Sequence, residues 1–258
     1  MNDELLDKFY TKNEIVQKII KNLLEDVFII EPSAGNGAFI KELKNEYIAF
    51  DILPEYENII NADFLEININ GYIPRNKKII SLGNPPFGKQ ANLAVKFFNK
   101  CAEFSDEIWF IVPRTFQKKS IHRRLNKYFY LIEEYNLPEN SFLFKNKEYN
   151  VTCCFQKWIK CNEKRNVEIK TTTKYFDFVK KSNNPDIAVR RVGINAGKYF
   201  LDIDKSESSF YFLKFKNKNH IEYFKTLYND LYNIGNNTAG CRSISKDELI
   251  NWFEQKIK

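Results

Sequence analysis

The sequence predicts an α/β fold with a mostly parallel sheet, followed by a small α+β region at the carboxyl end. Two observations predict this fold. Short apolar runs alternate with stretches of helical spacing over the first 160 residues, and several runs end at a glycine, a proline or an acidic residue. Because ligands of such sheets bind outside the carboxyl ends of the strands, the residues directly after each run are the candidate functional residues.

Six apolar runs are the predicted strands of the first region, and four stretches are its predicted helices. The strands are expected at residues 27–30, 47–50, 78–82, 108–112, 131–135 and 151–159, and the helices at 15–24, 38–44, 93–104 and 120–128. The first helix is expected to begin with a capping box, in which Thr11 is the N-cap and Glu14 bonds back to it.

The pattern changes after residue 160, where a polar and charged stretch follows the last predicted strand. We therefore expect a main domain over residues 1–160 and a small C-terminal region over residues 161–258. In the second region, strands are expected at 187–192 and 210–215, and helices at 220–232 and 246–256.

The composition fits a globular protein with a packed core. The chain is 43% hydrophobic, with 23 Phe and 14 Tyr. No apolar run approaches the roughly 18 residues of a membrane span, and the acidic start lacks the basic-then-apolar pattern of a signal peptide, so we expect a cytoplasmic location. The five cysteines contain no C-x-x-C pair, which favours free thiols and no metal site.

The net charge of +7 is compatible with a polyanionic partner such as nucleic acid. Only eight of the 40 basic residues are Arg, the side chain best suited to forked contacts with phosphate and guanine. The abundant Lys, Asn, Ile, Phe and Tyr also match the residue usage of an A/T-rich genome. Charge alone therefore favours nucleic acid only weakly.

A glycine turn follows the first predicted strand, in the segment Glu31-Pro32-Ser33-Ala34-Gly35-Asn36-Gly37. Gly35 and Gly37 allow positive φ and a close approach of the backbone to a ligand. A dinucleotide-binding turn has a third glycine where this chain has Ile40. The turn therefore disfavours NAD and leaves other nucleoside ligands open.

Acidic residues follow the second predicted strand and the loop after it. The carboxylate of Asp51 can accept both ribose hydroxyls of an adenosine ligand, while Ile52 lies against the purine. Asp63 and Phe64 can contact the adenine amine and the ring edge. An Asp after a strand is also a common turn residue, so these assignments depend on the glycine turn beside them.

The segment Asn84-Pro85-Pro86-Phe87 directly follows the third predicted strand. The two prolines fix the backbone and remove N–H donors, so that carbonyl oxygens face outward. Asn84 adds a side-chain carbonyl, and Phe87 adds a ring on which a base can stack. This combination predicts a site for the amino group of a planar base.

These segments resemble motifs of the S-adenosylmethionine-dependent amino-methyltransferases. The segment 31–37 looks like their motif I, and the segment 84–87 looks like motif IV in the form typical of N6-adenine enzymes. Phe9-Tyr10-Thr11 is similar to motif X, which helps to bind the methionine part of the cofactor. The order of the motifs resembles the gamma arrangement, and the resemblance covers roughly residues 9–160.

The resemblance implies a Rossmann-like methyltransferase fold with a mostly parallel, seven-stranded sheet. It also implies methyl transfer from S-adenosylmethionine to the exocyclic N6 amine of adenine in DNA, by a solitary enzyme or by the modification enzyme of a restriction system. The catalytic residues would be Asn84, Pro85, Pro86 and Phe87, and the cofactor-binding residues Tyr10, Thr11, Glu31, Pro32, Ser33, Gly35, Gly37, Asp51, Ile52, Asp63, Phe64 and Asn84.

Partners are expected from the same resemblance. The target base must be flipped out of its duplex, and a partner restriction endonuclease is expected if the chain belongs to a restriction system. The segments 189–193 and 237–240 resemble recognition regions of bacterial relatives. The candidate phosphate contacts are Lys118, Lys119, Arg123, Arg124, Arg190 and Arg191.

Four alternatives stay open at this point. An RNA adenine methyltransferase is the first, because some RNA enzymes carry the same Asn-Pro-Pro-Phe segment. A protein-glutamine methyltransferase usually has Tyr where this chain has Phe87. A non-catalytic nucleic-acid-binding module would not need Gly35, Gly37 and Asn84. An NAD-dependent oxidoreductase is disfavoured by the missing third glycine.

Overall fold

A computed structural model describes residues 9–235, 238 and 241–257. The chain divides into two compact units, Met1–Val167 and Glu168–Lys258, which are described separately below. The acidic start of the chain, on which the expected location rests, lies outside the described residues. Within the described residues, no helix combines the length and the apolar character that a bilayer span requires.

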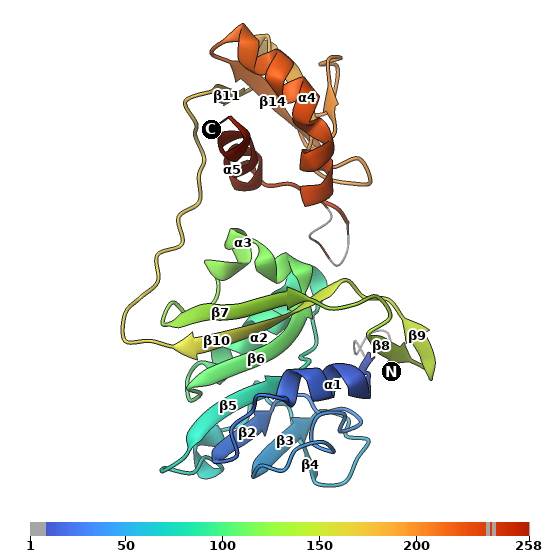
Figure 1. Ribbon diagram of the computed structural model, residues 1–258, viewed down its shortest axis with the longest axis vertical. Helices are drawn as coiled ribbons and strands as arrows, with labels where there is room; N and C mark the ends of the chain where they lie inside the picture. Colours follow the sequence, from blue (N-terminus) through green and yellow to red (C-terminus); the bar gives the residue numbers. More distant parts are fainter. Residues whose placement is uncertain (1–8, 236–237, 239–240, 258) are drawn as a thin grey trace. The chain divides into compact units, whose positions relative to one another are not determined.

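Unit 1 contains a seven-stranded sheet in the order β4-β3-β2-β5-β6-β10-β7 (Figure 1). Its strands are β2 (Val27–Glu31), β3 (Tyr47–Asp51), β4 (Ile59–Asn61), β5 (Lys78–Gly83), β6 (Glu107–Pro113), β7 (Phe129–Asn136) and β10 (Cys153–Lys160). Only β10 runs antiparallel to its neighbours in this sheet. The predicted α/β fold with a seven-stranded, mostly parallel sheet is therefore confirmed.

Apolar clusters cover the two faces of this sheet because successive side chains of a strand point to opposite faces. Helix α1 (Asn13–Ile20) packs its buried residues on one face, with Ile29 and Ile111 of the sheet. Helix α2 (Asn92–Cys101) and helix α3 (Lys119–His122) pack on the other face. Both faces are buried, as the apolar runs of β2 and β6 require.

A second sheet, of three strands, includes two of the first residues that the structure describes. It has the order β1-β8-β9, with β1 at Tyr10–Thr11, β8 at Phe142–Phe144 and β9 at Lys147–Tyr149. Strand β1 pairs with β8, so that Thr11 lies opposite Phe142. This pairing corrects the predicted capping box: Thr11 is a buried strand residue, and the N-cap of α1 is Lys12, without a side-chain cap.

The helix predicted at residues 38–44 is wrong, and the helix predicted at 120–128 is shorter than expected. Residues 35–42 form successive turns, because Glu42 and Leu43 bond three residues back and only Lys41 bonds four residues back. Helix α3 ends at His122, because the N–H of Asn126 donates to Asn99 Oδ1 at 2.7 Å rather than to the helix. Strands β1, β4, β8 and β9 were not predicted; each has two or three residues, too few for a periodic signal.

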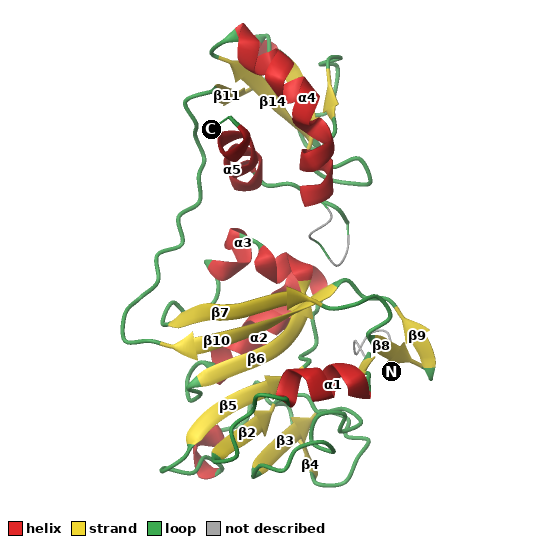
Figure 2. Ribbon diagram, viewed as in Figure 1, coloured by secondary structure: helices red, strands yellow, loops and turns green. Residues whose placement is uncertain are grey.

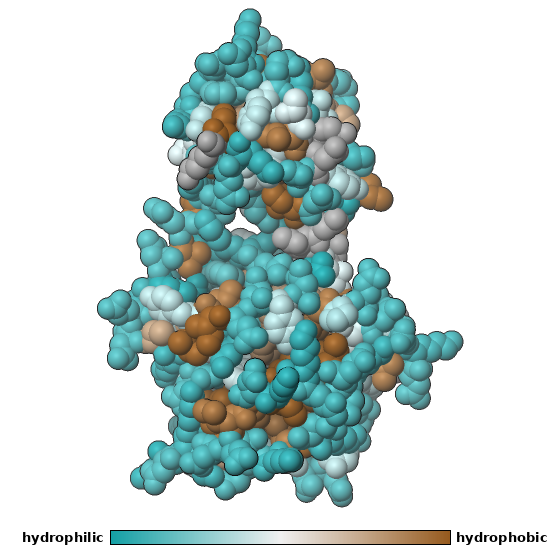
Figure 3. All heavy atoms as spheres, in the orientation of Figure 1, coloured by the Kyte–Doolittle hydropathy of each residue, from teal (hydrophilic) through white to brown (hydrophobic). Residues whose placement is uncertain are grey.

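Unit 2 contains a four-stranded antiparallel sheet with two helices (Figure 2). The strands are β11 (Phe176–Val179), β12 (Ile187–Arg190), β13 (Tyr199–Phe200) and β14 (Phe210–Phe215), in the order β11-β14-β12-β13, and the helices are α4 (Lys218–Ile234) and α5 (Lys246–Lys256). An aromatic core that includes Phe176, Phe224 and Phe253 joins one face of this sheet to the helices. Hydrophilic residues cover most of the face drawn in Figure 3.

One half-buried arginine, Arg165, holds the end of unit 1 in place. Arg165 donates from Nε to the Phe129 carbonyl at 2.6 Å and from Nη2 to the His122 carbonyl at 2.7 Å. Its guanidinium lies 5.1 Å from the ring centroid of Trp158, on which the ring of His122 also packs edge-on. Burial and, second, the charge of Arg165 lower the pKa of His122 to about 4.

This environment predicts a pH-dependent stability of unit 1. The imidazole of His122 in the unfolded chain binds a proton near pH 6.5, whereas the folded state resists protonation down to about pH 4. The contribution of neutral His122 is therefore complete above pH 6.5 and is lost as the pH falls toward 4. In urea unfolding at pH 7 and pH 5, the wild type should lose more stability than His122→Phe. Equal losses would contradict this account.

Candidate cofactor and substrate site

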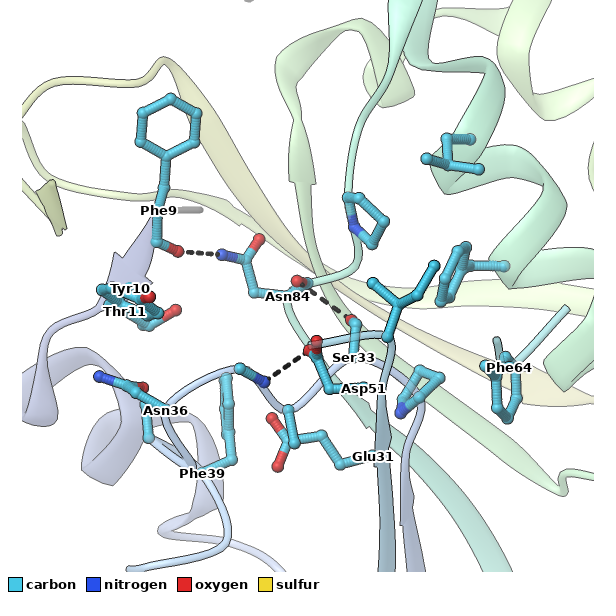
Figure 4. A pocket seen from close by; sticks show the side chains of 18 of the residues that line it. Phe9, Tyr10, Thr11, Glu31, Ser33, Asn36, Phe39, Asp51, Phe64 and Asn84 are labelled. Carbon is cyan, nitrogen blue, oxygen red and sulfur yellow. Dashed lines mark hydrogen bonds between the residues drawn. The ribbon is translucent and has the colours of Figure 1, made fainter. Parts of the chain in front are cut away.

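A cavity of about 280 Å³ opens at the carboxyl edge of the main sheet. The ends of β2, β3 and β5 contribute to its wall, and the residues of β1 close it from the side (Figure 4). This is the edge at which an open α/β sheet binds its ligands. Of the predicted site residues, the cavity is lined by Tyr10, Thr11, Glu31, Pro32, Ser33, Gly35, Asp51, Ile52, Asp63, Phe64, Asn84 and Pro86.

The glycine turn and the end of β3 are joined through one carboxylate. Gly35 has a φ of 52° and donates its N–H to Asp51 Oδ2 at 2.7 Å. Leu53 donates its N–H to Asp51 Oδ1 at 2.8 Å. Each carboxylate oxygen therefore has a fixed orientation and a remaining lone pair, which is what an acceptor for two neighbouring hydroxyls needs.

The cavity is acidic. Three carboxyl groups line it, those of Glu31, Asp51 and Asp63, and none of the described lining residues is basic. Burial and, second, the charge of Asp51 hold the pKa of Glu31 well above its usual range. Glu31 Oε2 is buried without a hydrogen-bond partner in the described part of the chain. Such a cavity favours a cationic ligand and disfavours the pyrophosphate of a dinucleotide.

Asn84 is held so that its side-chain oxygen stays unpaired. Its Nδ2 donates to the Phe9 carbonyl oxygen at 3.2 Å, and Ser33 Oγ lies 3.4 Å from the Asn84 carbonyl oxygen (Figure 4). Asn84 Oδ1 is buried and has no partner among the described residues. A buried acceptor without a partner carries a free-energy cost unless a ligand supplies a donor. The geometry therefore presents an acceptor for an N–H group.

The β8–β9 hairpin supports Phe9. The ring of Phe9 stacks on Tyr149 at a centroid distance of 5.0 Å and packs against Phe144 at 5.5 Å. Lys12 forms an ion pair with Glu148, and its N–H donates to the Ser141 carbonyl at 3.1 Å. The carbonyl that orients Asn84 is therefore fixed by contacts with residues more than 130 positions away in the sequence.

Three of the predicted catalytic and cofactor-binding residues lie outside the cavity lining, namely Pro85, Phe87 and Gly37. Pro85 is buried, and the half-buried ring of Phe87 packs against both apolar clusters of the main sheet. The Phe87 carbonyl accepts the N–H groups of Leu93 and Ala94, so the segment anchors the start of α2. The role of the Phe87 ring as a surface on which a base stacks remains a prediction.

Phe64 reaches the cavity from the core. Its ring is 2% exposed and stacks on Phe97 at a centroid distance of 5.7 Å. Ten further lining residues were not among the predicted site residues, and most of them are apolar: Phe9, Ala34, Asn36, Ala38, Phe39, Ala62, Leu65, Gly88, Leu93 and Phe97. The available signal was the position of Phe9 within motif X, of Ala34 and Asn36 within motif I, and of Gly88 directly after motif IV.

The predicted phosphate contacts do not gather at the cavity. None of Lys118, Lys119, Arg123 and Arg124 lines it, and these four residues follow β6, from the N-cap of α3 to just after its end. Arg123 and Arg124 are exposed. Arg190 and Arg191 belong to unit 2, at the end of β12.

A comparison with known protein families finds a match to a methyltransferase-like domain. Residues 40–158 match the family model of the EDM2 methyltransferase-like domain. No curated protein sequence matches the chain. The match supports methyl transfer as the class of reaction, and the acidic cavity fits S-adenosylmethionine, the predicted cofactor, whose sulfonium and ammonium groups are cationic.

Solved structures of methyltransferases are similar to part of this chain. A candidate RNA methyltransferase from Pyrococcus horikoshii is 18% identical, with a TM-score of 0.45 over 62% of this chain and 90% of that chain. A candidate class I S-adenosylmethionine-dependent methyltransferase from Listeria monocytogenes is 13% identical, with a TM-score of 0.40 over 63% and 60%. The Mtq2–Trm112 complex of E. cuniculi, which methylates the termination factor eRF1, is 12% identical, with a TM-score of 0.41 over 58% and 94%.

The glycine turn gives a testable requirement. Gly37 has a φ of 76°, and a Cβ atom there would lie 2.8 Å from Cδ1 of Tyr56. Gly37→Ala should shift the turn and weaken the binding of S-adenosylmethionine about tenfold or more, as measured by calorimetry. Gly71→Ala is the matched control, because its Cβ would meet no atom within 4 Å. Unchanged binding by Gly37→Ala would show that the turn does not position the cofactor.

Proposed function

We propose that the chain transfers a methyl group from S-adenosylmethionine to the exocyclic N6 amine of adenine in DNA. The chain would act as a solitary enzyme or as the modification enzyme of a restriction system. The observation that carries this proposal is the orientation of Asn84, whose buried Oδ1 has no partner among the described residues. An exocyclic amine is the donor that this oxygen and the adjacent proline turn accept best.

The residues of the turn act on the amine as it reacts. Asn84 Oδ1 accepts one N–H of the amine, and the main-chain carbonyl of Pro85 is proposed to accept the other. Positive charge develops on the nitrogen as it attacks the methyl group, so both acceptors bind the transition state more strongly than the ground state. Fixed acceptors of this kind typically contribute a few kcal/mol.

The residues proposed to bind the cofactor line the same cavity. S-adenosylmethionine supplies an electrophilic methyl group on a cationic sulfur. Asp51, already oriented by the N–H groups of Gly35 and Leu53, is proposed to accept the ribose hydroxyls. The unpaired Oε2 of Glu31 and the acidic lining around it offer a position for the ammonium group.

An RNA adenine is the competing substrate, because the turn around Asn84 recognises the amine and not the sugar. Incubation with labelled S-adenosylmethionine, separately with unmethylated DNA and with RNA, followed by nucleoside analysis, separates the two. N6-methyldeoxyadenosine supports the proposal. If only RNA is labelled, RNA replaces DNA as the proposed substrate. If neither nucleic acid is labelled, the result contradicts adenine methylation.

Asn84→Ala should abolish methyl transfer and keep the affinity for S-adenosylmethionine within several-fold, because the acceptor is lost and the cavity is retained. Asp51→Ala is the informative comparison: it should weaken cofactor binding first, since it removes an acceptor and releases Gly35 N and Leu53 N. Single-turnover rates and calorimetry measure the two effects. An active Asn84→Ala enzyme would exclude the proposed role of Asn84.

Tyr149→Ala should lower the single-turnover rate about tenfold, because Phe9 loses its stacking partner and the Asn84 amide loses a fixed orientation. Tyr149→Phe keeps the ring and should restore the rate. Calorimetry should show that Tyr149→Ala keeps the affinity for S-adenosylmethionine within several-fold. An equal loss of rate in Tyr149→Ala and Tyr149→Phe would mean that Tyr149 acts other than by stacking on Phe9.

A further inference from the structure

Five cationic side chains gather at one end of the sheet of unit 2, where β12 ends and β13 and β14 begin. We call this surface the basic end, and it consists of Arg190, Arg191, Lys198, Arg242 and Lys246. Main-chain hydrogen bonds bring the segments together: Arg190 N donates to Lys198 O, Ile244 N donates to Arg191 O and Gly193 N donates to Arg242 O, each at 2.8 to 2.9 Å.

Each of the five side chains packs over an aromatic ring. Arg191 and Lys246 share the ring of Tyr211, at 5.7 and 6.0 Å from its centroid. Arg242 and Lys198 share the ring of Tyr232, at 3.7 and 5.3 Å. Arg190 lies 4.9 Å from the ring centroid of Phe210. The rings hold the cations in place without neutralising them.

Seven of the ten other described lysines of unit 2 form ion pairs with carboxylates, namely Lys170, Lys181, Lys205, Lys214, Lys216, Lys225 and Lys256. No residue of the basic end has an ion pair within the described part of the chain. The nearby carboxylates of Glu248 and Asp247 accept hydrogen bonds from Ser245 and from Lys170 N.

Building on the function proposed above, we propose that the basic end binds the phosphate backbone of the nucleic acid without reading its bases. Unpaired cations that are fixed at one end of a small unit are complementary to a row of phosphates. The aromatic support limits the side-chain entropy that each cation loses on binding.

The hydrogen bonds of the arginines limit base readout. Each guanidinium already uses one N–H group within unit 2, which restricts the directions in which its remaining donors can point. Nε of Arg190 donates to Val192 O, Nε of Arg191 donates to Ser208 O, and Nη2 of Arg242 donates to Tyr232 O. The two lysines are point charges, which suit phosphate rather than a base edge.

The test is the salt dependence of duplex binding by the full chain, measured by fluorescence anisotropy on two duplexes of unrelated sequence. The variant Lys198→Gln/Lys246→Gln removes two cations of the basic end whose side chains donate none of the hydrogen bonds described here. The matched control, Lys205→Gln/Lys225→Gln, removes two ion-paired lysines of the same unit. Both variants change the net charge equally.

The first variant should reduce the slope of log affinity against log salt by up to about 2 on both duplexes, since each phosphate contact contributes about 0.9. The control should keep the wild-type slope. Equal slopes for both variants, a loss confined to one duplex, or binding to anionic vesicles in place of DNA would overturn the inference. Methyl transfer is no part of the readout, so an inactive wild type would contradict the proposed function and leave this test intact.

Discussion

The carbonyl of Phe9 accepts a hydrogen bond from the amide nitrogen of Asn84 and thereby holds the amide oxygen in one orientation, as an acceptor. An amide that could flip would present donors and acceptors in turn and would stabilise no developing charge. The position of Phe9 depends in turn on the pairing of β1 with β8 and on the stacked ring of Tyr149. The orientation of Asn84 therefore depends on two parts of unit 1 that are distant in sequence, namely Phe9 and the β8–β9 hairpin.

Charge is distributed unevenly over the molecule. The chain carries a net charge of +7, yet the described lining of the cavity has three carboxyl groups and no basic side chain. The unpaired cations of unit 2 lie on a different compact unit. A cationic small molecule and a polyanion would thus be attracted to different surfaces, which removes direct competition between cofactor and nucleic acid for one site.

Local sequence was sufficient where a local interaction decides the structure. Helix α5 begins and ends as predicted, and Ser245 and Glu248 form a capping box there. The equivalent pattern at Thr11 was wrong, because pairing with Phe142 makes Thr11 a strand residue. The motifs located most of the cavity for the same reason, since glycine and proline act on their own backbone. The role of Phe9 depends on contacts 75 and more residues away and left no local pattern.

The antiparallel insertion of β10 and the late position of the hairpin also fix the order in which the site can form during synthesis. A ribosome releases Phe9 and Asn84 well before Tyr149, so a nascent chain holds the motif without the ring that secures it. Strand β7 cannot join the sheet before β10 arrives between it and β6. A chain that ends before the hairpin would therefore carry the recognisable motifs without the ring that holds Phe9 in place.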